Sequence, residues 1–206
     1  MSTRLGLVSD VHSSPVPLRQ ALELFRAEAV DDIICAGDIA GYYDPVEPTI
    51  ALLREFGCRT IIGNHDQSFL EKTEETEYLS ERAFLENLPE TLTLEIEGLR
   101  IMVVHANPPS EQHGGIKLLD QQGELIPERV ELWQEKLEGF PYDVLIVGHT
   151  HQVYAERLGE VMVINPGSSV FNHSCMILSL PDLEVQTFAL EGKDIVKCWH
   201  FGMLNQ

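Results

Sequence analysis

The chain has 206 residues and a formal net charge of −19, from 33 acidic and 14 basic side chains. This excess of negative charge argues against a long nucleic acid or an anionic membrane surface as a partner. A small phosphate ester is still compatible with this net charge as a ligand, because bound cations reverse the electrostatic field inside a binding cleft. At this length and with 44% hydrophobic residues, we expect one globular domain over residues 1–206.

The cysteines and the N-terminal residues indicate the cellular compartment that we expect for this protein. The four cysteines are far apart and show no C-x-x-C spacing, which favours reduced thiols over disulfides or a zinc site. No apolar run approaches the roughly 18 residues that a membrane span needs. The first residues run directly into a predicted strand, so we expect no signal peptide and a cytoplasmic protein. The sequence leaves open whether the protein forms a homo-oligomer.

In chain order, short apolar runs at residues 5–9, 32–36 and 59–62 predict three buried strands. Apolar residues with helical spacing lie between them, at residues 18–25 and 50–56. This alternation of strands and helices predicts a parallel sheet with right-handed crossovers, and hence an α/β fold.

The rest of the chain predicts a mixed sheet. Residues 67–88 have a helical pattern with an acidic face that we expect to be solvated. The runs 91–96 and 99–104, joined by a turn, predict a hairpin. Residues 106–126 are rich in Pro and Gly, and we expect this long loop to line the substrate entrance. Later elements are a helix over residues 127–137 and strands over residues 143–147, 161–164, 175–180, 183–188 and 195–199.

Polar side chains follow five of the predicted strands. They are Asp10 and His12; Asp38; Asn64, His65 and Asp66; His105; and His149 and His151. Ligands of open α/β sheets gather outside the carboxyl ends of the strands, so these side chains predict one site. A lone buried histidine is usually structural, but five of the eight histidines lie in these clusters.

The residue types point to metal ions. Carboxylate, carboxamide and imidazole form a ligand set without thiolate, which suits manganese, our first choice, or iron, cobalt, nickel or zinc. About seven ligands exceed what one tetrahedral ion uses, and they fit two ions about 3.5–4 Å apart that share a carboxylate. Two divalent ions, two aspartates and one hydroxide leave a charge of about +1, which attracts a phosphate. A nearby imidazole can protonate the leaving group.

The order of the motifs resembles a known family. Asp10-x-His12, Gly37-Asp38, Gly63-Asn64-His65-Asp66, His105 and Gly148-His149-Thr150-His151 look like the five motifs of the calcineurin-like metallophosphoesterase superfamily. Asn165-Pro166-Gly167-Ser168 resembles the turn that follows in its small bacterial phosphodiesterase branch. The resemblance implies a four-layer α/β/β/α sandwich of two mixed sheets flanked by helices.

The resemblance also implies a role for each site residue. One metal ion would be held by Asp10, His12, Asp38 and His151, and the second by Asp38 as the bridge, Asn64, His105 and His149. His65 would be the acid near the leaving group. We expect Asp66 to accept a hydrogen bond from one ring nitrogen of His65 and so to aim the imidazole.

Two departures from the family pattern alter the rim of the site. Ser13-Ser14 follow His12 where the branch commonly has Gly-Asn, and Ala106 follows His105 where a Gly commonly stands. Three further histidines lie outside the motifs. Among these, His113 on the long loop is a stronger candidate for substrate contact than His173 or His200.

We therefore expect a metal-dependent phosphoric ester hydrolase that cleaves a phosphodiester by attack of a metal-bridged hydroxide. A phosphomonoesterase or protein phosphatase is the alternative among enzymes. A catalytically silent protein-binding scaffold is the alternative of another class, because the small subunit of the retromer resembles this fold. His65 favours an enzyme, since a scaffold has no need of an acid imidazole. A nuclease is disfavoured by the negative charge.

Overall fold

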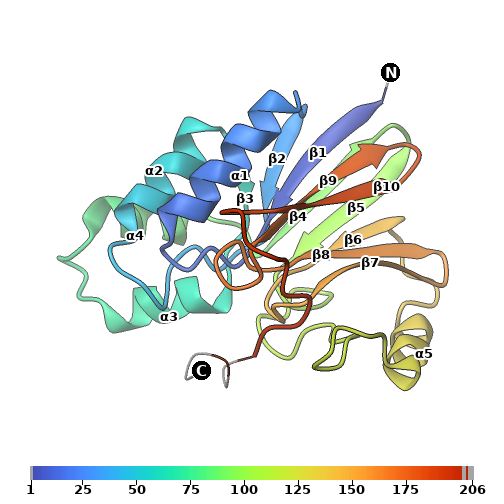
Figure 1. Ribbon diagram of the computed structural model, residues 1–206. Coiled ribbons are helices and arrows are strands. Elements are labelled where there is room, and N and C mark those ends of the chain that lie inside the picture. The colour runs from blue at the N-terminus through green and yellow to red at the C-terminus, as the bar shows by residue number, and fades with distance from the viewer. Residues whose placement is uncertain (1, 201–202, 204–206) are drawn as a thin grey trace.

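The computed structural model describes residues 2–200 and 203, and it contains two five-stranded sheets packed face to face (Figure 1). The first sheet has the order β10-β9-β1-β2-β3 and the second has the order β4-β5-β6-β8-β7. The first comprises β1 (Thr3–Val8), β2 (Asp32–Cys35), β3 (Arg59–Thr60), β9 (Ser174–Leu180) and β10 (Glu184–Ala189). The second comprises β4 (Thr91–Ile96), β5 (Leu99–Val104), β6 (Val144–Ile146), β7 (Val153–Leu158) and β8 (Val161–Pro166).

Both sheets are mixed, as predicted. β1, β2 and β3 run parallel, with Leu7 opposite Ile34, whereas β9 and β10 are antiparallel additions. In the second sheet β5, β6 and β8 run parallel, and β4 and β7 pair antiparallel at its two edges. The parallel strands of each sheet end in the loops that carry the predicted site residues.

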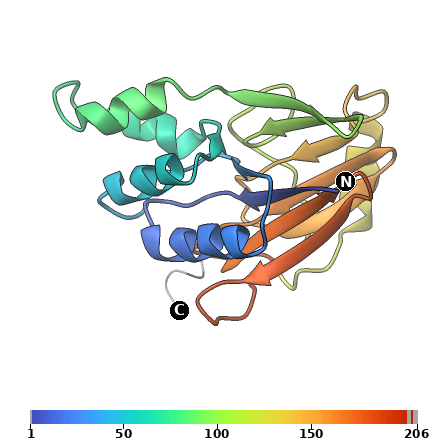
Figure 2. The same ribbon diagram turned by 90° about the horizontal axis from the view of Figure 1, so that it is seen from above.

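Helices cover the outer faces of the two sheets. α1 (Pro15–Ala27) and α2 (Glu47–Glu55) pack on the first sheet, and α5 (Pro127–Lys136) packs on the second. α3 (Asn64–Lys72) and α4 (Leu79–Glu86) lie beside α1 and α2, so α1 to α4 are on one side of the strands and α5 is on the other (Figure 2). The predicted four-layer α/β/β/α sandwich is confirmed. Among the described residues, no helix is long and apolar enough to cross a membrane.

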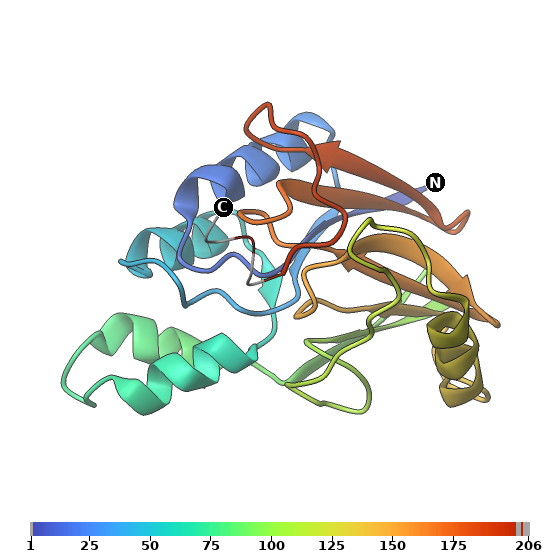
Figure 3. The same cartoon turned by 60° about the horizontal axis from the view of Figure 1, so that its bottom comes forward.

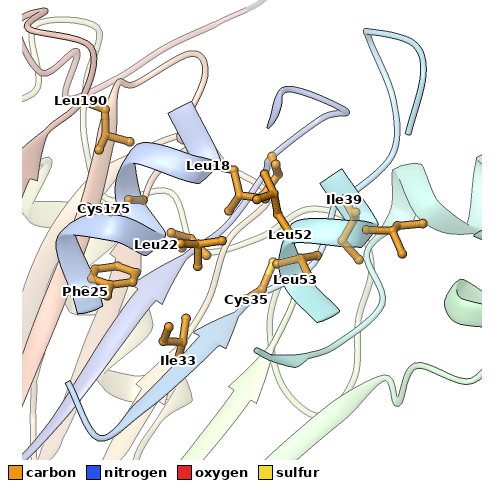
Figure 4. Packing of buried hydrophobic residues seen from close by; sticks show 14 of the residues in the cluster. Leu18, Leu22, Phe25, Ile33, Cys35, Ile39, Leu52, Leu53, Cys175 and Leu190 are labelled. Atoms are coloured by element: carbon orange, nitrogen blue, oxygen red, sulfur yellow. The ribbon is translucent and has the colours of Figure 1, made fainter. Parts of the chain in front are cut away.

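Three apolar clusters hold the layers together. Leu18, Leu22 and Phe25 recur on one face of α1 and pack toward the first sheet, beside Cys35 and Cys175 (Figure 4). A second cluster lies between the sheets, where strand alternation turns every other side chain inward. The third joins the outer face of the second sheet to α5 and to the loop after β5.

Three elements differ from the sequence predictions by more than the position of their ends. Residues 195–199, predicted as a strand, form an extended segment with one isolated bridge, between Gln152 and Cys198. β7 was not predicted, because Glu156 and Arg157 interrupt its apolar pattern at the edge of the sheet. The helix predicted over residues 67–88 is two helices: α3 begins earlier, at Asn64, and six residues separate its end from α4.

Candidate metal centre

The predicted ligands come together where the strands of both sheets end. Three groups of side chains each have their ligand atoms within 4.8 Å of one another. They are Asp10, His12 and His151; His12, Asp38 and His65; and Asp38, His105 and His149. Asp10 and Asp38 follow strands of the first sheet, whereas His105 and His149 follow strands of the second. The site is therefore built across both sheets.

The first group surrounds the buried Asp10. Nε2 of His12 lies 3.0 Å from Nε2 of His151, which in turn lies 3.4 Å from Oδ1 of Asp10. Nδ1 of His12 lies 3.3 Å from the carbonyl oxygen of Ala40, so this nitrogen carries the proton and Nε2 presents its lone pair to the group. Two nitrogens that each lie about 2.0–2.1 Å from one ion are roughly 3 Å apart. The pair therefore fits a metal ion.

The third group, of Asp38, His105 and His149, surrounds the amide oxygen of Asn64. Oδ1 of Asn64 lies 3.1 Å from Nε2 of His105 and 2.9 Å from Nδ1 of His149. Nε2 of His105 is also 3.3 Å from Oδ2 of Asp38, and its Nδ1 donates to the carbonyl oxygen of Ala36 at 2.8 Å. Oxygen and imidazole nitrogen donors thus converge in a set that suits a divalent transition metal.

Asp38 connects the two halves of the site. It belongs both to the group with His12 and His65 and to the group with His105 and His149. Its Oδ1 accepts the backbone N–H of His65 at 2.8 Å, in the first turn of α3. The N-terminal end of a helix carries a partial positive charge that stabilises a carboxylate. The start of α3 therefore holds Asp38 and also supplies Asn64 to the third group.

Two motif glycines leave the space that the carboxylates occupy. A Cβ atom on Gly63 would lie 2.2 Å from Oδ1 of Asp38, and one on Gly148 would lie 2.8 Å from Oδ2 of Asp10 and 2.0 Å from Oγ of Ser9. Real Cβ atoms do not approach other atoms so closely, so a side chain at either position would displace a carboxylate. The glycines of these motifs are required for packing of the site rather than for chemistry.

The backbone around the site is strained. Asp10, His12, Asp38, His149 and His151 all have a positive φ, between 48° and 65°. Left-handed residues other than glycine are uncommon, and each costs about 1–2 kcal/mol. Such strain persists where the surrounding structure enforces it, and it gathers at functional sites. Five of the seven predicted metal ligands share it, which indicates that the loops are shaped to aim these side chains.

Burial and neighbouring charges shift the pKa values in the site. Burial disfavours the charged forms of Asp10 and Asp38, but the surrounding imidazoles lower the pKa of both carboxyls below the ordinary value. Burial lowers the pKa of His12 and that of His149 to about 4. Burial also opposes a charge on His105, but Asp38 outweighs it and raises the pKa of His105 to about 9. His12 and His149 are therefore ready to bind a metal at neutral pH, and on His105 an ion would replace a proton.

His65 lies over the first group, at the mouth of the site. Its ring centroid is 4.8 Å from that of His12, and its ring stacks on Tyr42 at the same centroid distance. His65, Tyr42 and Asp38 line a cavity of about 270 Å³ that also has His149 and His151 in its wall. The imidazole thus faces the space into which the predicted ligands converge.

Asp66 does not make the hydrogen bond to His65 that the sequence predicts. Its Oδ1 accepts the backbone N–H groups of Ile39 and Ala40 at 2.9 and 2.7 Å, and its Oδ2 accepts that of Gly63 at 2.9 Å. The fully buried carboxylate therefore joins the loop after β2 to the start of α3. Asp66 positions the backbone rather than the imidazole, because its two oxygens accept one amide at the start of α3 and two amides in the loop after β2.

The long loop over residues 106–126 is fixed to the second sheet. The buried side chain of Gln152 accepts the N–H groups of Leu118 and Leu119 and donates to the carbonyl oxygen of Leu119. Lys117, from the same loop, lines the cavity of the site, and the role of the loop at a substrate entrance stays a prediction. His113 lies at the edge, with its ring centroid 6.2 Å from that of His149.

Residues near the end of the described chain line the cavity although no sequence pattern marks them. Trp199 and His200 line it, although His200 was a weak candidate and Trp199 was assigned to a strand. The N–H of Trp199 donates to the carbonyl oxygen of His151, and the indole stacks on Phe171 at a centroid distance of 4.1 Å. No local motif marks these residues, because their place depends on contacts with residues distant in the sequence, such as His151 and Phe171.

Comparison with known proteins identifies the family. The model of the calcineurin-like phosphoesterase superfamily domain matches residues 3–180. The chain therefore belongs to this superfamily. Its grouped Asp and His side chains are candidate metal-binding residues on a phosphoesterase fold.

Related proteins are distant in sequence. A phosphodiesterase of Methanocaldococcus jannaschii is 26% identical, over 80% of this chain and 82% of that protein. An uncharacterized protein of the same archaeon is 27% identical over 73% of this chain, and the match spans 63% of that protein's length, which is less than two thirds.

Solved structures share the fold at lower identity. A hypothetical protein from Pyrococcus horikoshii has a TM-score of 0.74 at 17% identity, covering 98% of this chain and 91% of that one. Vacuolar protein sorting 29 from Cryptosporidium parvum has a TM-score of 0.55 at 17% identity, covering 91% of this chain and 96% of that one. These likenesses establish the fold alone.

The strain after His12 gives a first prediction. Ser13 has a φ of 56°, and its buried hydroxyl has no hydrogen-bond partner among the described residues. Ser13→Gly removes about 1–2 kcal/mol of left-handed strain but adds roughly 0.5–1 kcal/mol of backbone entropy to the unfolded state. We expect the free energy of unfolding to rise by about 0.5–1 kcal/mol in urea titrations of the metal-free protein.

Ser14 provides the matched control, because its φ is −108° and its side chain makes no capping hydrogen bond. Ser14→Gly adds the same entropy without relieving strain, and we expect a loss of about 0.5–1 kcal/mol. Equal destabilisation by both substitutions would contradict the assignment of strain to Ser13.

Proposed function

We propose that the protein hydrolyses a phosphodiester at a centre of two divalent metal ions. The observation that carries the proposal is that Asp38 belongs to two groups of ligand-type side chains, one with His12 and His65 and one with His105 and His149. A shared carboxylate is the feature that distinguishes a two-metal site from two separate ones. The phosphodiesterase among the archaeal relatives supports a diester as substrate.

We assign the ligands in two sets that meet at the carboxylate of Asp38. The first set is Asp10, His12, Asp38 and His151, and the second is Asp38, Asn64, His105 and His149. Their nitrogen and oxygen donors suit Mn²⁺ best, with Fe, Co, Ni or Zn as alternatives. Two such ions, when bound, supply a hydroxide near neutral pH and neutralise the charge of the phosphate.

His65 is assigned as the general acid. Its imidazole stands beside the first set and in the wall of the cavity, where the leaving oxygen of a bound ester would lie. The ring donates its proton to that oxygen as the P–O bond breaks. Stacking on Tyr42 and the backbone bond to Asp38 limit its movement, since both ends of the residue are held. Asp66 contributes indirectly, by fixing the backbone on either side.

Two alternatives share the fold. A phosphomonoesterase or protein phosphatase would use the same metal ligands and differ in what surrounds the phosphate. A silent protein-binding scaffold would have no use for His65 or for buried, converging donors. Because buried carboxylates are unfavourable without a compensating charge, the burial of both Asp10 and Asp38 supports a metal-binding enzyme over a scaffold.

Metal content provides the second prediction. We expect about two equivalents of Mn²⁺ in the fully active protein, measured by elemental analysis after dialysis. His151→Ala removes a ligand of one ion only, so we expect about one equivalent to remain. Asp38→Ala removes the shared ligand, and we expect less than one. Full activity with no more than one equivalent in the wild-type protein would contradict a two-metal centre.

The acid role of His65 provides the third prediction. His65→Gln keeps a side chain of similar size, so we expect the fold and both metal equivalents to be retained. For diesters with alkoxide leaving groups, we expect kcat to fall roughly 10²–10⁴-fold, the usual contribution of general acid catalysis. For nitrophenyl diesters the loss should be much smaller, because nitrophenolate leaves without protonation. An equal loss for both kinds of leaving group, or no loss for either, would exclude the acid role.

A further inference from the structure

A second cavity adjoins the candidate catalytic cavity. Its volume is about 350 Å³, and it lies between the loop before α5, the start of α5 and the last described residues. Four residues line both cavities: Lys117, Thr150, Trp199 and His200. The two cavities therefore lie side by side, within reach of one molecule that is bound at the candidate metal centre.

One wall of this cavity is a segment that we call the C-terminal strap, residues 190–200. The strap is held along its length: Val196 donates its N–H to Asn172, Lys197 accepts the N–H of Val153, and Trp199 donates to His151. Figure 3 shows the strap running beside the loop that follows β5 (Figure 3). It lies beyond residue 180, where the match to the family model ends. The second cavity thus depends on a part of the chain that the family match does not include.

The cavity presents positive charge in an acidic protein. Lys117 and Arg129 line it, and neither forms an ion pair within the described part of the chain. Arg129 donates to the carbonyl oxygen of Leu119 in the same wall at 3.4 Å. Asp120 is the acidic lining residue, but one of its oxygens accepts the N–H groups of Gln122 and Glu124 and so serves the turn.

We infer that the second cavity is a substrate subsite that binds an anionic group carried by one alcohol of the phosphodiester. This inference rests on the proposed function. Lys117 and Arg129 bind the second anion, a phosphate or carboxylate, by charge-assisted hydrogen bonds. The alkyl or ring portion of the substituent packs against Trp199, Leu119 and Ile126. The preferred substrate is therefore a diester with at least one negative charge besides that of the scissile phosphate.

Two matched substrates test the subsite in the Mn²⁺-loaded protein. Para-nitrophenyl butyl phosphate and para-nitrophenyl phosphonopropyl phosphate share a leaving group and differ in one terminal anion. We expect the wild-type kcat/KM to be roughly tenfold higher for the phosphonopropyl ester. The preference should shrink as salt screens the cations. We expect Arg129→Gln and Lys117→Gln each to reduce the preference by about threefold.

Arg100→Gln is the matched control, since it removes the same charge near the start of β5, at the opposite end of that strand from His105. This variant should keep the wild-type preference. Equal kcat/KM for both esters in the wild-type protein would overturn the subsite while leaving the proposed function intact. A preference that Arg100→Gln reduces as much as Arg129→Gln would also overturn it, because the effect would then follow net charge alone.

A binding measurement separates failure of the subsite from failure of the proposed function. If the protein hydrolyses neither ester, the proposed function fails. Calorimetry with butylphosphonate and propane bisphosphonate still measures whether the second cavity binds an anion. Tighter binding of the bisphosphonate, weakened by Arg129→Gln and not by Arg100→Gln, supports an anionic subsite. Equal affinity for the two phosphonates overturns it.

Discussion

The face-to-face packing of the two sheets is the constraint on which the candidate site depends. Leu5 and Leu7 of β1 meet Val103 of β5 and Ile146 of β6 in an apolar layer that excludes water. This layer fixes the ends of the parallel strands of both sheets at one edge. Neither sheet alone carries a complete set of donors, since the carboxylates follow the first sheet and His105 and His149 follow the second. Any change that shifts the sheets relative to each other also separates the donors.

The site is held in an unfavourable electrostatic state by the rest of the fold. Asp10, Asp38 and Asp66 are almost completely buried and close together, and burial disfavours the charged form of each. Imidazoles compensate for Asp10 and Asp38. Three backbone amides offset the burial of Asp66 only in part, because burial and the charge of Asp38 raise its pKa to about 7. Left-handed backbone at five of the predicted ligands adds strain. Bound cations would relieve the remaining repulsion, so folding and metal binding are expected to be coupled.

Much of this arrangement could be predicted from the sequence, because ligand-type residues stand directly after apolar runs. Asp10, Asp38 and His105 are examples, and their strands occur where the pattern predicts them. The role of Asp66 could not be predicted in the same way, because its partners are backbone amides brought near by the fold. Trp199 was misplaced because an extended segment held by hydrogen bonds to Asn172 and His151 has the same apolar pattern as a strand. Local patterns predict elements, whereas contacts distant in sequence decide what the loops do.

We propose that two metal ions bind on either side of Asp38. Diffraction can locate these ions directly. Crystals grown with Mn²⁺ and measured at the manganese absorption edge report the positions of the ions through anomalous scattering. We expect two peaks, one enclosed by Asp10, His12 and His151 and one by Asn64, His105 and His149, each next to the carboxylate of Asp38. A single peak, or two peaks that do not share Asp38, would contradict this proposal.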